Sequence, residues 1–228
     1  MQTKRRIIEY VLGAGLLCTV TAAGVATGLK TEGNMLTSIT QISNRCQRNI
    51  GADGFGHAVI GDANISGQSG VIAQPCKVRL KAGSTLQLNN VHLETKNLLI
   101  EDSPLIKRPS HMVINNTSLV SPVGGLQIKL GAAKSTVAVK NSLFSYALSV
   151  GISVGQTDKD FATILNVNNS VFRSKSPDTE GIVLVSTGQA IVRQSRFESS
   201  ATGGQALLLG TQCTLVDNSG ANQQCQGE

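Results

Sequence analysis

The sequence predicts an all-β fold, a single-domain solenoid with capped ends, from its composition and from a repeat that runs through most of the chain. The 228 residues include 24 glycines and no tryptophan, and short runs of Val, Ile and Leu stand between polar turn residues. This composition favours strands and tight turns over helices. With only two Tyr and five Phe, the core has to be built mainly from aliphatic side chains. The length suits one domain with a continuous core.

An amide residue recurs at nearly constant spacing. The intervals are 26, 25, 28, 25 and 24 residues, and the positions are Asn90, Asn116, Asn141, Asn169, Gln194 and Asn218. Apolar or small side chains stand two and four positions before each amide, as Val137 and Val139 do, and this period of two predicts a strand with one buried face. The apolar set resumes three positions after the amide, at Phe144 and Phe172. The change of phase predicts a bend in every copy, and Asn suits a bend because it tolerates left-handed backbone conformations.

A second strand-like run follows each copy, for example NLLIED at 97–102 and GIVLVS at 181–186. Each coil therefore carries at least two strands. The pattern resembles the pectin-lyase-like superfamily of right-handed parallel β-helices, closely over residues 84–221 and loosely over 45–83. The resemblance implies that architecture, with the amides forming an internal ladder, and says almost nothing about activity. Two other repeat folds fit less well. A β-propeller needs about 40 residues per blade, which is more than the repeat provides, and the sequence frame of a leucine-rich repeat is absent.

The ends of a solenoid need covering, because a terminal coil exposes core and unpaired backbone. Met35, Leu36, Ile39 and Ile42 stand at helical spacing within 34–46, so we expect a short amphipathic helix over the N-terminal end, with an irregular strand as the alternative. The predicted segments are a signal peptide at 1–26, a cap with irregular first coils at 27–83, regular coils at 84–221 and a tail at 222–228.

The first 26 residues have the parts of a secretory signal. Lys4, Arg5 and Arg6 precede an apolar run and then small residues up to Ala26. An uncleaved membrane anchor is the alternative. Without this segment the formal charge falls from +6 to +4, which argues against nucleic acid as a partner. We expect an exported protein, periplasmic, at the cell surface or secreted, that contacts a membrane only if the segment is retained.

Four cysteines remain beyond the leader. An even number in an exported chain favours disulfides, and no Cys-x-x-Cys pair argues for zinc. Of the three possible connectivities we favour Cys46–Cys76 with Cys213–Cys225, because each bond then closes a local loop at one end of the body.

Catalytic motifs are not apparent. Glycoside hydrolases need one carboxyl group as acid and another as base, but the Asp-Asp, Asn-x-Asp and Gly-His-Gly segments of polygalacturonase-like β-helices are missing. The Gly-x-Ser-x-Gly frame of a nucleophilic serine is missing as well. His57, in a Gly-rich stretch, is the best single candidate, whereas His92 and His111 are typical of surface positions. We expect no catalytic residue, metal or cofactor.

Four basic residues, Lys140, Arg173, Arg193 and Arg196, stand at outward strand positions and are expected to share one edge. They predict a shallow ledge for an anionic polysaccharide or cell-surface component; a solvated polar edge is the alternative. The leading hypothesis is an exported, non-enzymatic β-helix that binds a glycan or a surface partner along its lateral face. The alternatives are a divergent carbohydrate-active enzyme, such as a polysaccharide lyase, and a structural subunit of a surface fibre.

Overall fold

The computed structural model of the chain describes residues 38–102, 108–123, 126–130, 134–146, 152–154, 164–174, 184–199, 205–220 and 222–226. The predicted signal peptide lies outside these residues. Within them, no helix has the length and apolar character that crossing a membrane requires.

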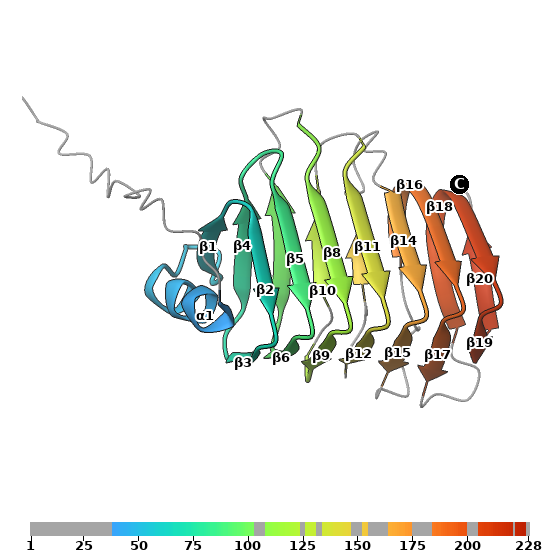
Figure 1. The fold of residues 1–228 in the computed structure, drawn as a ribbon, viewed down its shortest axis with the longest axis horizontal. Helices are drawn as coiled ribbons and strands as arrows, with labels where there is room; N and C mark the ends of the chain where they lie inside the picture. Colours follow the sequence, from blue (N-terminus) through green and yellow to red (C-terminus); the bar gives the residue numbers. More distant parts are fainter. Residues whose placement is uncertain are drawn as a thin grey trace, which may run out of the picture. The chain divides into compact units, whose positions relative to one another are not determined.

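Three parallel sheets, which we name A, B and C, run side by side along the solenoid (Figure 1). Sheet A contains β1 (Gly56–Ile60), β4 (Cys76–Leu80), β7 (Leu98–Asp102), β10 (Leu126–Lys129) and β13 (Ile152–Val154). Sheet B contains β2 (Ala63–Ser66), β5 (Thr85–Asn89), β8 (His111–Asn115), β11 (Thr136–Lys140), β14 (Ile164–Asn168), β16 (Leu184–Arg193), β18 (Gln205–Val216) and β20 (Asn222–Gln226). Sheet C contains β3 (Ser69–Ile72), β6 (His92–Thr95), β9 (Ser118–Ser121), β12 (Leu143–Tyr146), β15 (Val171–Ser174), β17 (Arg196–Ser199) and β19 (Ser219–Gly220). The predicted all-β solenoid is confirmed, with pairing that begins at Gly56, well before the predicted boundary at residue 84.

Each coil turns sharply where it passes from sheet B to sheet C. The turn residue has a positive φ of 46° to 52° in six successive coils, at Asn90, Asn116, Asn141, Asn169, Gln194 and Asp217. The predicted bend is thus confirmed for the first five positions. The sixth was assigned wrongly to Asn218, because Asp also tolerates a left-handed backbone and spacing alone cannot tell neighbours apart.

The internal ladder is made by the residue after the left-handed turn residue. The prediction that the amides form it is therefore wrong for the first five, and it holds for Asn218, whose Oδ1 accepts the Ser195 N–H at 2.8 Å. The five amides from Asn90 to Gln194 are exposed, whereas the residues that follow the last four of them, Thr117, Ser142, Ser170 and Ser195, are buried. The Thr117 N–H donates to Ser142 Oγ at 3.1 Å, and the Ser142 N–H donates to Ser170 Oγ at 3.2 Å. The ladder continues from Ser170 to Ser195. At this corner the left-handed residue points its side chain outward, and the following side chain turns into the core.

The core consists of in-register columns of aliphatic side chains, as the composition predicts. Val137 and Val139 of β11 are fully buried between the equivalent residues of β8 and β14. In sheet C, Phe144 stacks on Phe172 with ring centroids 5.0 Å apart, and Phe172 stacks on Phe197 at 5.7 Å. These columns hold successive coils in register, which fixes the positions of the outward-facing side chains between them.

Helix α1 (Ile39–Arg48) packs against β1, β3 and β4 at the N-terminal end and buries Ile39 and Ile42. The prediction of an amphipathic helix, in preference to an irregular strand, is confirmed; Met35 and Leu36, two of its predicted apolar residues, lie outside the described residues. The Cys46–Cys76 disulfide, also predicted, joins α1 to β4. Cys213 is disulfide-bonded as well, but the side chain of Cys225 lies outside the described residues, so that pairing stays a prediction.

Candidate binding groove between sheets B and C

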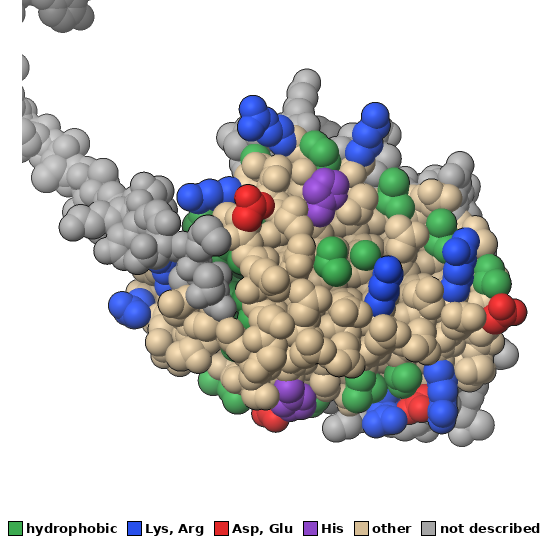
Figure 2. All heavy atoms as spheres, viewed as in Figure 1, with side chains coloured by type: hydrophobic (Ala, Val, Ile, Leu, Met, Phe, Trp, Pro, Cys, Tyr) green, Lys and Arg blue, Asp and Glu red, His purple; other side chains and the backbone are tan. Residues whose placement is uncertain are grey.

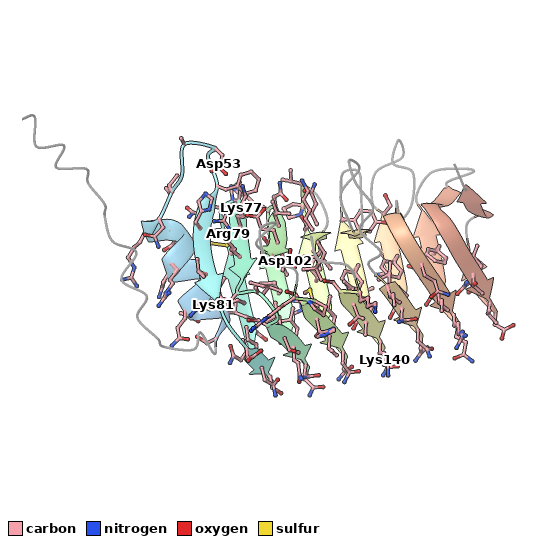
Figure 3. All side chains as sticks on the ribbon, turned by 90° about the horizontal axis from the view of Figure 1, so that it is seen from above. Asp53, Lys77, Arg79, Lys81, Asp102 and Lys140 are labelled. Atoms are coloured by element: carbon pink, nitrogen blue, oxygen red, sulfur yellow. A yellow bond between two sulfur atoms is a disulfide. The ribbon has the colours of Figure 1, made fainter. Side chains whose placement is uncertain are left out.

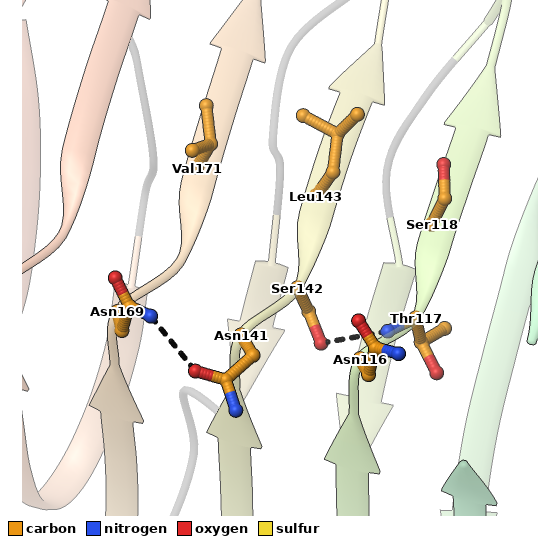
Figure 4. A pocket seen from close by; sticks show the side chains of 8 residues that line it. All are labelled: Asn116, Thr117, Ser118, Asn141, Ser142, Leu143, Asn169 and Val171. Atoms are coloured by element: carbon orange, nitrogen blue, oxygen red, sulfur yellow. Dashed lines mark hydrogen bonds between the residues drawn. The ribbon is translucent and has the colours of Figure 1, made fainter. Parts of the chain in front are cut away.

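An open groove of about 290 Å³ follows the turn between sheets B and C across three coils (Figure 4). We call it the corner groove. Its lining residues are Asn116, Thr117, Ser118, Asn141, Ser142, Leu143, Asn169 and Val171. Each of the three coils contributes one turn amide and one outward side chain of sheet C to the groove, and the first two coils also contribute the hydroxyl residue that follows the amide.

One wall of the corner groove is a row of exposed amides. The Asn169 Nδ2 donates to Asn141 Oδ1 at 2.8 Å, and Asn116 Nδ2 donates to Asn90 Oδ1 at 2.6 Å. Asn141 Nδ2 lies 3.5 Å from Asn115 Oδ1. A primary amide offers two donors and two acceptor lone pairs, so these contacts leave hydrogen-bonding capacity directed at solvent. The wall can both donate and accept.

The opposite wall is partly aliphatic. Leu143 and Val171 occupy the same outward column of sheet C on neighbouring strands, preceded by Ser118, and all three are half-buried. On the buried side, the Ser142 hydroxyl donates to the Lys140 carbonyl at 2.6 Å. The corner groove is therefore amphipathic, with free polar groups on one side and hydrocarbon on the other.

The four basic residues predicted to share one edge lie on two different sheets. Lys140 and Arg193 end strands of sheet B, whereas Arg173 and Arg196 belong to sheet C on the other side of the turn. Figure 2 shows the outer face of sheet B as mostly uncharged, with separate basic side chains, and a mixed basic and acidic group lies below it over sheet C. A single ledge of four cations is not formed.

Glu198 pairs with both cations of sheet C and balances one of their two charges. Its carboxylate lies 2.6 Å from Arg173 Nε and 2.9 Å from Arg196 Nη2. The hydrogen bond from Arg173, helped by the charge of both guanidinium groups, holds the pKa of Glu198 below its usual value. Lys140, labelled in Figure 3, and Arg193 are exposed and form no ion pair with any other described side chain. The sheet B cations are the ones available to a ligand.

No protein-family model, curated protein or solved structure matches this chain.

A second polar cluster surrounds His57, the best histidine candidate from the sequence. Asp53 Oδ1 lies 3.1 Å from His57 Nε2, Asp53 Oδ2 lies 2.7 Å from Lys77 Nζ, and Lys77 lies 5.3 Å from the centroid of the Phe55 ring (Figure 3). The hydrogen bonds from Lys77 and His57 hold the pKa of Asp53 well below its usual range. Among the described residues, no hydroxyl or thiol hydrogen-bonds to His57. The cluster secures the turn at 51–55 against sheet A.

The other two histidines lie at ordinary surface positions. His92 is exposed and lies 3.8 Å from Glu94, and His111 is half-buried with Nδ1 2.8 Å from Thr136 Oγ1. Leu143 and Val171 were not among the site residues predicted from the sequence. Each of them stands two residues after a turn amide, and the repeat places the two on neighbouring coils. This spacing was the signal that could have predicted the groove wall.

Proposed function

We propose that this protein is an exported, non-enzymatic β-helix protein that binds an extended glycan along the corner groove. The observation that carries the proposal is an exposed row of three amides that faces a partly aliphatic wall, with Leu143 and Val171 on two neighbouring coils. We further propose membership of the pectin-lyase-like superfamily, for which the parallel sheets and the left-handed amide at each turn are the support.

A pyranose ring matches the corner groove in its chemistry. Its hydroxyl groups both donate and accept hydrogen bonds, as amides do, while the C–H groups of its face are apolar and suit Leu143 and Val171. Parallel strands repeat at about 4.8 Å, which is similar to the length of one sugar ring in an extended chain. Successive coils would therefore meet successive sugars. With aliphatic contacts in place of stacked aromatic rings, binding to each sugar is weak and depends on chain length.

Export is supported by the Cys46–Cys76 disulfide, because disulfides persist in oxidising compartments. The signal-like N-terminal segment supports it independently. Sequencing of the amino terminus of the protein recovered outside the cytoplasm tests export and the cleavage of this segment. A new terminus near residue 26 is expected, and an intact Met1 there would reject a cleaved signal peptide.

Glycan binding is tested by retention of the mature protein on a panel of immobilised neutral and acidic polysaccharides. A triple variant, Asn116→Gly/Asn141→Gly/Asn169→Gly, removes the amides of the corner groove and leaves residues that accept positive φ. The control, Gln194→Gly, removes a turn amide of the same backbone conformation that does not line the groove.

We expect the parent and the control to be retained and the triple variant to be released, with all three folded by circular dichroism. Failure of the parent to bind any glycan, or equal retention of the triple variant, would reject the proposal. The eluted polysaccharide is also assayed for new unsaturated or reducing ends. Their appearance would replace the non-enzymatic proposal with the lyase or hydrolase alternative.

A further inference from the structure

Amides and cations alternate over four successive strands in the outward column of sheet B beside and just past the corner groove; Asn89 precedes these four residues and Val216 follows them. Strand pairing puts Asn115 opposite Lys140, Lys140 opposite Asn168, and Asn168 opposite Arg193. From this alternation we infer that the ligand is a glycan with one anionic group per disaccharide, in which charged and neutral sugars alternate. The inference rests on the proposed glycan binding and specifies the class of glycan.

The spacing of the two cations follows from the register. Lys140 and Arg193 are two strands apart in sheet B, so their Cα atoms are separated by about 10 Å, twice the spacing of parallel strands. Two sugars of an extended chain cover a similar length. A chain that follows the corner groove and continues one coil past Asn169 therefore brings an anionic group to Lys140 and the next one to Arg193, while the sugar between them meets Asn168.

The charge balance of the surrounding side chains points to the same two residues. Glu198 already binds Arg173 and Arg196, whereas Lys140 and Arg193 form no ion pair among the described residues and are exposed. A homopolymer with an anion on every sugar would direct charged groups at Asn115 and Asn168, where only neutral amides are present. A neutral chain would leave both cations solvated and gain nothing from them.

The effect of the cations on affinity is modest and salt-dependent. Exposed ion pairs each stabilise weakly and are screened over about 10 Å at 0.1 M salt. Two such pairs correspond to a preference of about 3- to 10-fold for the alternating polymer over its neutral form at low salt. Groove contacts through amides and aliphatic side chains persist when that preference is removed.

The test compares three polysaccharides by affinity electrophoresis at low and high salt. They are an alternating polymer with one carboxylate per disaccharide, the same polymer after reduction of its carboxyl groups, and a homopolyuronate. The Lys140→Gln/Arg193→Gln variant removes the proposed cations. The Arg173→Gln/Arg196→Gln variant changes the net charge by the same amount at the pairs bound to Glu198.

We expect the parent to prefer the alternating polymer, and to lose the preference at about 0.5 M salt, where screening lengths are a few ångströms. Lys140→Gln/Arg193→Gln should bind the alternating and reduced polymers equally, and the Arg173→Gln/Arg196→Gln control should keep the preference. The inference would be overturned, while glycan binding stands, if the parent bound the homopolyuronate as tightly as the alternating polymer. It would also be overturned if Lys140→Gln/Arg193→Gln and Arg173→Gln/Arg196→Gln lost the preference for the alternating polymer equally. Binding of none of the three polymers would overturn the inference, and failure across the whole polysaccharide panel would overturn the proposed function as well.

Discussion

The internal hydroxyl ladder gives a sharp prediction for Ser142→Ala. The Ser142 hydroxyl accepts the Thr117 N–H at 3.1 Å and donates to the Lys140 carbonyl at 2.6 Å. Both Thr117 and Ser142 are buried, with 3 % of each residue exposed. Alanine removes the hydroxyl with little change in volume, and the Thr117 N–H is then buried without this partner.

The magnitude follows from the cost of an unsatisfied buried donor. Leaving one buried N–H without its acceptor costs about 1–3 kcal/mol, so we expect Ser142→Ala to lower the free energy of unfolding by about 2 kcal/mol. For a domain of this size, 1 kcal/mol shifts the melting temperature by about 2–4 °C. The variant should therefore melt about 4–8 °C below the parent.

The matched control is the neighbouring exposed residue, in the variant Asn141→Gly. Asn141 has a φ of 49° and an exposed side chain, so glycine keeps the turn and removes an exposed amide together with its solvent-exposed hydrogen bonds to Asn169 and Asn115. We expect a loss below about 1 kcal/mol, measured for both variants by urea and thermal unfolding followed by circular dichroism. If Asn141→Gly destabilises more than Ser142→Ala, the hydroxyls are not the internal ladder.

Three further predictions concern other parts of the solenoid. Gly220→Ala should destabilise by at least about 1 kcal/mol, because Gly220 has a φ of 100° and an added Cβ would lie 1.9 Å from a backbone oxygen of the preceding coil; Gly54→Ala, with no atom within 4 Å of the added Cβ, should cost less in the same unfolding assay. Replacing both cysteines of the α1 disulfide by alanine should cost about 3 kcal/mol, since the bond closes a loop of 30 residues, and an unchanged melting temperature would contradict this. The pKa of Glu198, followed by carbon NMR, should lie below its ordinary value of 4.5 and rise in Arg173→Gln. The Arg173–Glu198 pair stabilises the fold above about pH 4.5, and this contribution is lost as the pH falls through the lowered pKa. An equal Glu198 pKa in the parent and in Arg173→Gln would refute the ion pair.

The repeat predicted most of the fold because its signals are local. A period of two marks the buried face of a strand, and the change of phase at Asn141 marks the turn. Which of two adjacent turn residues faces the core is not encoded in that period. Asn141 and Ser142 are both small and polar, and the backbone conformation of the turn, which directs the first outward, decides between them.

The candidate site was predicted less completely because it depends on distances between coils. Arg173 and Glu198 are 25 residues apart, one repeat, so their pairing could have been found by testing the register for opposite charges. The division of the four cations between two sheets follows from the turn between Arg193 and Arg196, which the sequence marks only by Gln194. The volume of the corner groove depends on side-chain size at several coils, which no local pattern reports.

The most direct test of glycan binding is an NMR titration of the side-chain amides with an oligosaccharide of the polymer that the protein retains. The Asn116, Asn141 and Asn169 NH₂ resonances should shift progressively with ligand, because these amides line the corner groove. The Asn90 resonance, from the turn outside the groove lining, should move less. Saturating shifts confined to another face, with the three groove amides unchanged, would contradict the account.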